Sequence, residues 1–200
     1  VEPVITPVRR IPHVLQSKVK KELRLMENAK IIERVDEPTD WVNQMVVVVK
    51  KDGSLRICLD PRNLNKAVKR AHHPFPTLDE ISAKLSGAKW FCKLDAQSGF
   101  WMLPLDKRSS RLCTFQTPWG RYAFLRLPFG LNSAPEIFHR VISRTFEDFE
   151  NIMTFQDDIL LWGNTKEQLG TGLEKVLARA KSMGIKFNPN KCIFFSKEVD

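Results

Sequence analysis

The hydrophobic residues change their spacing several times along the chain, and each spacing predicts a different kind of element. Leu15, Val19, Leu23 and Met26 recur every three or four residues after a proline-rich start. This period is that of one face of an α-helix. We therefore expect a surface helix that ends near Ala29.

The stretch QMVVVVKKDGSLRICLD has a different pattern. A β-branched run leads into an Asp52-Gly53 turn, and apolar residues then alternate with others up to Leu59. This combination predicts a β-hairpin over residues 45–59, which we expect to form a small lobe.

Three helix starts are marked by Ser or Thr followed three residues later by Glu or Gln, the signature of a capping box. They are Thr77 with Glu80, Ser133 with Glu136, and Thr165 with Gln168. Strand-like runs lie between these helices, at 89–95, 100–105, 111–117, 121–127, 152–155 and 159–162. Helices mixed with antiparallel hairpins, without regular strand-helix alternation, predict an α+β fold in which helices back an antiparallel sheet.

Charge adds information about the partner. The 200 residues include 32 Lys and Arg against 23 Asp and Glu, a net charge of +9 that is spread along the chain. This favours a polyanionic partner, nucleic acid before an acidic lipid surface. No run approaches the ~18 apolar residues of a membrane span, and the N-terminus lacks a signal-peptide pattern. We expect an intracellular protein with no membrane partner.

The four cysteines are far apart in the sequence. None belongs to a CxxC pair, and no His stands at zinc-ligand spacing. The pattern predicts neither a disulfide framework nor a zinc site, so we expect reduced thiols packed as small hydrophobic side chains.

Two adjacent carboxylates, Asp157 and Asp158, interrupt the apolar stretch TFQDDILL, and Asp95 follows another apolar run. Carboxylates at strand ends suit Mg²⁺, and a pair of such ions can drive displacement at phosphorus. A solvated turn tip or an Asx turn would also explain the Asp pair, and a lone Asp after a strand is a weaker signal. The residues alone leave these alternatives open.

Five stretches, taken together, resemble a known family over nearly the whole chain. They are VVVVKKDGSLRICLDPRNLNK, AKWFCKLDAQSGFWMLPLD, TPWGRYAFLRLPFGLNSAPEIFHRVI, TFQDDILLWG and GIKFNPNKCIFF. Their order and spacing resemble the reverse transcriptase of gypsy-type long-terminal-repeat retrotransposons. The resemblance implies an RNA-directed DNA polymerase that transfers a dNTP to a primer 3′-hydroxyl.

The same resemblance implies a right-hand polymerase fold with a small fingers lobe. Residues 1–76 are then expected to be fingers and residues 77–200 mainly palm, with part of the fingers at 108–130. Thumb, RNase H and integrase segments are expected to lie outside this chain, within a longer Pol polyprotein.

The family's three metal-binding aspartates correspond to Asp95, Asp157 and Asp158, and the carbonyl of Ala96 is implied as a further metal contact. The implied cofactor is a pair of Mg²⁺ ions, with Mn²⁺ as an alternative.

Nucleotide contacts are implied by the resemblance at six positions. In the fingers hairpin a Lys and an Arg would hold the triphosphate, while other contacts would meet the triphosphate, the sugar and the base. These residues are Lys50, Arg56, Ser98, Gly99, Phe100 and Phe129.

Phe100 has the most specific implied role, because a ring under the sugar would exclude a 2′-hydroxyl. For the residue alone, a place in the core is the simpler reading. Lys50 likewise has a simpler reading, as a charge on an exposed strand.

Three positions depart from the family pattern: Phe155, Pro61 and Met102. They keep open a catalytically silent, domesticated or decayed nucleic-acid-binding module. An RNA-directed RNA polymerase is a further alternative, against which Phe100 argues.

The implied partners are an RNA or DNA template with its primer, dNTP and the rest of the polyprotein. The implied location is the cytoplasm, in a virus-like particle, with a nuclear phase as an alternative.

Overall fold

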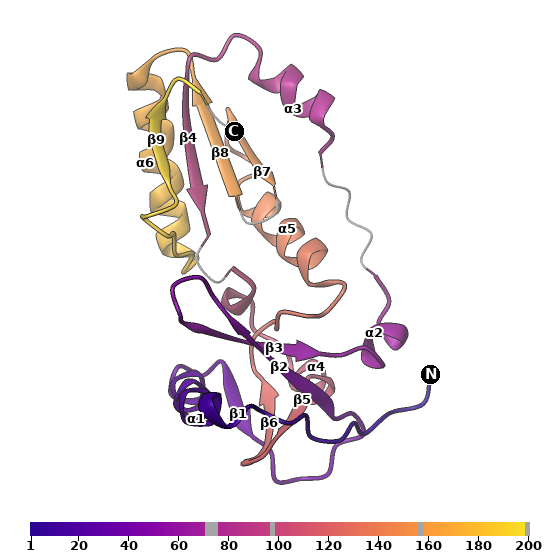
Figure 1. Ribbon diagram of the computed structural model, residues 1–200. Coiled ribbons are helices and arrows are strands. Elements are labelled where there is room, and N and C mark those ends of the chain that lie inside the picture. Colours follow the sequence, from indigo (N-terminus) through magenta and orange to yellow (C-terminus); the bar gives the residue numbers. More distant parts are fainter. Residues whose placement is uncertain (71–75, 97–98, 156–157, 199–200) are drawn as a thin grey trace. The chain divides into compact units, whose positions relative to one another are not determined.

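The computed structural model describes residues 1–70, 76–96, 99–155 and 158–198. The chain divides into two compact units, each built from two separate stretches. The first unit comprises Val1–Arg70 and Leu103–Ala134, and the second comprises Ala71–Met102 and Pro135–Asp200. Both units can be followed by colour in Figure 1.

The first unit is built on a five-stranded sheet with the strand order β1-β6-β5-β2-β3. Its elements are α1 (His13–Asn28), β1 (Ile32–Arg34), β2 (Asn43–Val49), β3 (Leu55–Asp60), α2 (Leu64–Ala67), α4 (Lys107–Leu112), β5 (Thr114–Thr117) and β6 (Gly120–Phe124). The strands β2 and β5 pair in parallel, and the other neighbours are antiparallel. The side-chain amide of buried Asn43 donates to the carbonyls of Leu112 and Thr114, which ties this parallel junction together.

The expected helix and hairpin of this unit are confirmed. In α1, the residues Val19, Leu23 and Met26 form the buried face. In the hairpin, six residue pairs join β2 to β3, and Gly53 takes a φ of +78° at the turn. The backbone N–H of Ser54 donates to Asp52 Oδ1 at 2.9 Å, so the aspartate side chain closes the turn.

Two strand predictions are wrong. Residues Gly99–Met102 form a 3₁₀ helix instead of a strand over 100–105. Lys107–Leu112 form α4, so the strand expected at 111–117 is only the shorter β5. Helix α4 begins because the Asp106 carboxylate accepts the Ser109 N–H at 2.9 Å and the Ser109 hydroxyl at 2.7 Å. This side-chain cap outweighs the apolar residues that suggested a strand.

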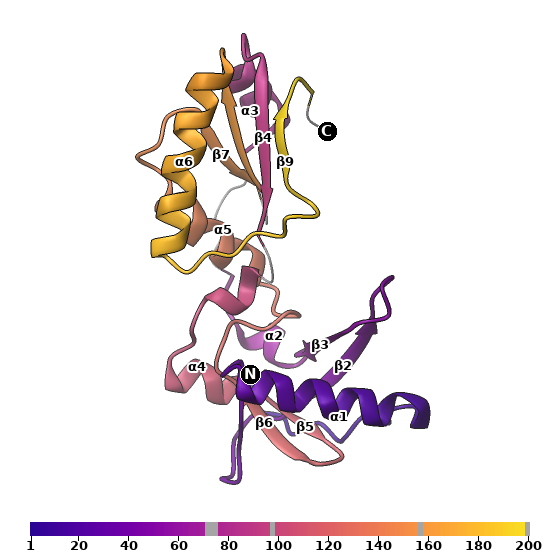
Figure 2. The same cartoon turned by 90° about the vertical axis from the view of Figure 1, so that its left-hand side faces the viewer.

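The second unit is built on a four-stranded antiparallel sheet with the order β7-β8-β4-β9. Its elements are α3 (Leu78–Leu85), β4 (Trp90–Asp95), the 3₁₀ helix η1 (Gly99–Met102), α5 (Ala134–Thr145), β7 (Ile152–Phe155), β8 (Asp158–Gly163), α6 (Lys166–Ser182) and β9 (Ile193–Ser196). Helix α6 packs on β4 and β8, and Figure 2 shows α5 on the same side of the sheet. The expected antiparallel sheet backed by helices is therefore confirmed.

Strand alternation determines which side chains of this sheet are buried. Cys92 and Leu94 of β4 are buried, as are Ile159 and Leu161 of β8. The intervening side chains, among them Asp95, point to the opposite face and stay partly exposed. The acidic ends of the strands therefore lie on the face that α5 and α6 leave uncovered.

Ser133 directly precedes α5. The capping box expected at α3 is confirmed, because Thr77 and Glu80 bond reciprocally. At α6, Thr165 accepts the Gln168 N–H as expected, while the Gln168 side chain accepts the Asn164 N–H. Glycines follow both helices, with φ of +83° at Gly87 and +70° at Gly184.

All four cysteines are free thiols, as expected. Cys92 and Cys113 are buried, while Cys58 and Cys192 are half-buried. Burial raises the pKa of Cys113 to about 12, so this thiol stays protonated and packs as a small apolar group. Within the described ranges, no helix has the length and apolar character needed to span a membrane.

Candidate active site

Two of the expected metal-binding aspartates, Asp95 and Asp158, lie directly opposite each other. Asp95 ends β4, Asp158 begins β8, and the antiparallel register pairs Asp95 with Asp158. Directly opposed residues project from the same face of a sheet, with Cβ atoms about 4.5–5.5 Å apart. Neighbouring strands thus bring together two carboxylates that are far apart in the sequence.

Each of these carboxylates has a lysine partner. Lys191 Nζ lies 3.1 Å from Asp95 Oδ2, and Lys93 Nζ lies 3.1 Å from Asp158 Oδ2. Neither lysine belongs to the residues expected at the site from the sequence. Lys93 could have been found, because it stands two residues before Asp95 and alternation places both on one face.

A turn before β9 carries Lys191 to this site. The Asn188 N–H donates to the Asp95 carbonyl at 2.9 Å, and the Lys191 N–H donates to the Asn188 carbonyl at 3.1 Å. The strand that holds the aspartate therefore also anchors the turn that holds the lysine. No local sequence signal reveals a contact between residues 96 positions apart.

Ala96 is buried beside Asp95 and forms an antiparallel bridge with Phe187. Asp157 and Ser98, the other residues expected near the aspartates, lie outside the described residues.

The donor atoms at this site suit a hard cation. Asp95 and Asp158 supply carboxylate oxygens, which Mg²⁺ and Mn²⁺ prefer over nitrogen and sulfur ligands. Among the residues that the structure describes, no three His, Cys, Asp or Glu side chains form a metal-binding group. The expected third carboxylate, Asp157, is not among those residues.

Gly99 has a clear packing role. A Cβ atom built on Gly99 would come within 2.5 Å of the Phe138 ring. Phe100 packs edge-on against the same ring, with 5.6 Å between ring centroids, and is half-buried. Buried Phe138 of α5 thus packs against both Gly99 and Phe100, and Phe100 is not a fully buried core residue.

Two expected nucleotide-binding residues meet in the first unit. The Arg56 guanidinium lies over the Phe129 ring, 4.8 Å from its centroid. The Phe129 carbonyl accepts the Leu59 N–H at 2.9 Å, so the ring is held beside β3. The ring restricts the position of the guanidinium, whose planar set of donors suits the binding of phosphate.

Lys50 stands at the tip of the β2–β3 hairpin and is exposed. Its N–H donates to the Ser54 carbonyl at 2.8 Å, so the backbone is fixed while the side chain reaches solvent. Val48 lies opposite Arg56 in the register, and alternation places Lys50 on the face of Val48. The two expected triphosphate contacts thus share one face of the hairpin.

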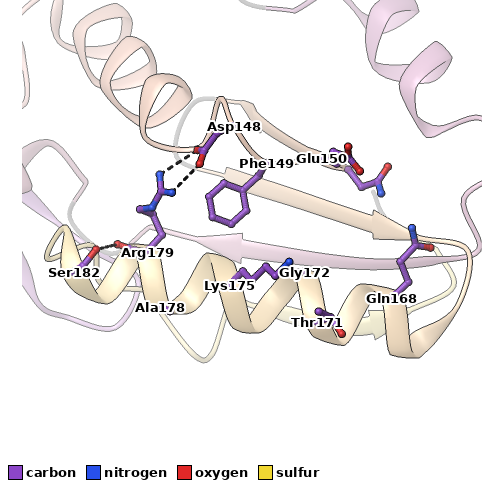
Figure 3. Close-up of a pocket in the computed structure, with 11 residues that line it drawn as sticks. Asp148, Phe149, Glu150, Gln168, Thr171, Gly172, Lys175, Ala178, Arg179 and Ser182 are labelled. Atoms are coloured by element: carbon purple, nitrogen blue, oxygen red, sulfur yellow. Dashed lines mark hydrogen bonds and ion pairs between the residues drawn. The ribbon is translucent and has the colours of Figure 1, made fainter.

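A groove of about 960 Å³ in the second unit shares no residue with these sites; Figure 3 shows its lining. Arg179 of α6 donates to both carboxylate oxygens of Asp148, at 3.1 and 2.8 Å, and to the Thr145 carbonyl at 2.8 Å. These bonds lower the pKa of Asp148 and raise that of Arg179. The guanidinium also covers the Phe149 ring. We assign this groove a structural role, the joining of α6 to the loop after α5.

Comparison with known proteins supports the motif analysis. Residues 48–200 match the family model described as reverse transcriptase (RNA-dependent DNA polymerase). The retrovirus-related Pol polyprotein from transposon 412 of Drosophila melanogaster is 32% identical over 99% of this chain. The enzymatic polyprotein of Cestrum yellow leaf curling virus is 35% identical over 72% of it. The chain spans 16% and 23% of those two relatives.

Solved structures share the fold. The foamy viral protease-reverse transcriptase in complex with dsDNA superimposes with a TM-score of 0.89 at 22% identity, over all of this chain and 42% of that one. The foamy viral protein with an RNA/DNA hybrid gives a TM-score of 0.85 at 21% identity, over 97% of this chain and 26% of the other. The expected polymerase fold is confirmed, while the limits of fingers and palm and the gypsy-type subclass stay predictions. The chain belongs to the reverse transcriptase family.

Proposed function

We propose that this chain is the fingers and palm part of an RNA-directed DNA polymerase, which joins a dNTP to a primer 3′-hydroxyl with release of pyrophosphate. One observation carries the proposal beyond family membership. Asp95 and Asp158 face each other across β4 and β8, and each carboxylate forms an ion pair with a lysine. A pair of carboxylates opposed across two strands lowers stability through charge repulsion. A function that requires both carboxylates explains why the pair is present.

Asp95, Asp158 and Asp157 would hold two Mg²⁺ ions, together with the Ala96 carbonyl. When bound, such ions favour the deprotonated form of the 3′-hydroxyl and neutralise charge on the leaving pyrophosphate. The protein's own contribution is to hold the carboxylates rigidly. The β4–β8 ladder runs unbroken from the pair Trp90 and Gly163 to the two aspartates, which supports this role.

Arg56 and Lys50 are proposed to contact the triphosphate of the dNTP, with Phe129 supporting the plane of the Arg56 guanidinium. Phe100 is proposed to contact the sugar, and Ser98 and Gly99 to contribute backbone N–H groups. The packing of Phe138 against Gly99 supports this for Gly99, because it holds the backbone from which the Gly99 N–H would project.

The proposed nucleic-acid partner is an RNA or DNA template with its primer. Structures of similar foamy viral proteins are described as complexes with dsDNA and with an RNA/DNA hybrid. The relatives named above are polyproteins, so we propose that this chain works within a longer Pol polyprotein, in the cytoplasm and in a virus-like particle.

The direct test is primer extension on a primed RNA template with dNTP, in Mg²⁺, in Mn²⁺ and in EDTA. The chain is assayed by itself and within the longer polyprotein. We expect metal-dependent extension, at least in the polyprotein. Tight binding of the primed template without any incorporation would instead support the silent nucleic-acid-binding module.

Phe100 provides a test of the choice between DNA and RNA synthesis. We expect Phe100→Val to raise the kcat/KM for rNTP relative to dNTP, because a smaller side chain leaves space for the 2′-hydroxyl. The ratio is measured with matched dCTP and CTP, alongside a melting curve. Phe91→Val, at another half-buried Phe of the same unit, serves as the control. An unchanged ratio in a folded Phe100 variant would contradict the proposal that Phe100 excludes the 2′-hydroxyl.

A further inference from the structure

Each of the two candidate metal-binding carboxylates that the structure describes forms an ion pair with a lysine. The Lys191 and Asp95 pair and the Lys93 and Asp158 pair each measure 3.1 Å between nitrogen and oxygen. Both contacts are ion pairs, and Lys191 Nζ also donates a hydrogen bond to Asp95 Oδ2. Each ammonium group therefore neutralises an oxygen that a divalent cation would need.

Electrostatics explains why the pairs form. Two like charges directly opposite each other on neighbouring strands destabilise a sheet. Asp95 and Asp158 stand in that relation, and the Asp95 side chain is only 17% exposed, so water screens it poorly. Two cations of the protein itself relieve the repulsion.

The two lysines differ in how firmly they are held. Lys93 lies within β4, and its side chain is 28% exposed. Lys191 reaches the site from the turn anchored by Asn188, and its side chain is 64% exposed. Water can solvate the exposed ammonium group of Lys191 when it moves away, so Lys191 can leave Asp95 without disturbing the sheet.

We propose that Lys93 and Lys191 are internal counter-ions, which stabilise the carboxylate pair when no metal is bound and compete with divalent cations for it. The inference rests on the proposed function, since it assumes that these carboxylates bind metal. Metal binding then requires an exchange of partners, in which the ammonium groups give up the carboxylates. The lysines lower the affinity for metal and offset the repulsion between the two carboxylates when no metal is bound.

The test is a titration of the chain with Mn²⁺, in which electron paramagnetic resonance measures the free ion. Lys191→Met keeps the apolar stem and removes the charge. We expect it to bind Mn²⁺ about two- to fivefold more tightly than a matched control, the size expected for loss of an exposed ion pair. Lys186→Met is that control, because Lys186 is exposed in the same segment and, within the described part of the chain, has no ion pair.

Thermal unfolding supplies a second readout. In EDTA we expect Lys191→Met to melt about 1–4 °C below Lys186→Met, because one counter-ion of the carboxylate pair is gone. In saturating Mn²⁺ this difference should vanish or reverse. A purely structural lysine would give the same difference under both conditions, and that result would contradict the inference.

Asp158→Asn separates failure of this inference from failure of the proposed function. If Asp158→Asn binds Mn²⁺ as tightly as the unaltered chain, the carboxylate pair is not the metal site and both proposals fall. If Asp158→Asn loses Mn²⁺ while Lys191→Met and Lys186→Met bind alike, the metal site stands and the counter-ion role is refuted.

Discussion

Asp158→Asn is expected to reduce nucleotide incorporation by at least about a hundredfold, the usual scale for losing a group that stabilises charge in the transition state. Asparagine has the same shape as aspartate but lacks the negative charge that a divalent cation requires. The fold should survive, because the substitution removes one of two opposed carboxylates in the β4–β8 ladder. Initial rates of primer extension in Mg²⁺, together with a melting curve, measure both effects.

Asp148→Asn is the matched control for that experiment. Asp148 is an acidic residue of the same unit, but its carboxylate is bound by Arg179 and belongs to the groove next to α6. Its loss should affect stability and leave incorporation per folded molecule unchanged. Incorporation at the normal rate by Asp158→Asn would show that the cross-strand pair is not the catalytic centre.

Gly130→Ala is expected to lower the free energy of unfolding by about 3 kcal/mol or more, from two causes that add. Gly130 has a φ of +114°, which side chains disfavour, and an added Cβ atom would overlap the Leu59 carbonyl oxygen. That oxygen belongs to the backbone of β3 and has little freedom to move. The neighbouring contact between Arg56 and Phe129 should also be displaced, since Phe129 precedes the glycine.

Gly120→Ala separates the two causes. Gly120 belongs to the same unit and has a φ of +121°, but nothing lies within 4 Å of an added Cβ atom. The control should lose only the conformational part, about 1–2 kcal/mol. Denaturant unfolding followed by circular dichroism compares the variants, and equal losses would mean that the close approach to Leu59 has no energetic weight.

Elements with local signals were predictable from the sequence. The Asp52-Gly53 turn, the Thr77 capping box and the apolar period of α1 each act within a few residues, and the structure has all three. The strand predicted at residues 100–105 is wrong, because the aromatic residues there favour strands in general but do not form one here. There, the close packing of Gly99 on Phe138, a residue distant in sequence, accompanies a 3₁₀ turn.

The candidate site was predictable in its residues but not in its contacts. Asp95 and Asp158 followed from the resemblance, whereas their direct pairing depends on the register of β4 with β8. The same holds for Arg56 over Phe129 and for Lys191 at Asp95, which join distant parts of the chain. Such contacts depend on tertiary structure, and spacing in one sequence does not encode them visibly.

The interleaving of the two units constrains when each can form during synthesis. The first unit needs Leu103–Ala134 to supply β5 and β6, and the second resumes only at Pro135. When only residues 1–102 have left the ribosome, the first sheet therefore lacks two of its three interior strands, and the second sheet has only β4. Because β1 joins that sheet only through β6, the early chain leaves β1 and β2 with unpaired edges. Such edges invite aggregation, so nascent chains of this protein are most exposed to it before residue 124 has emerged.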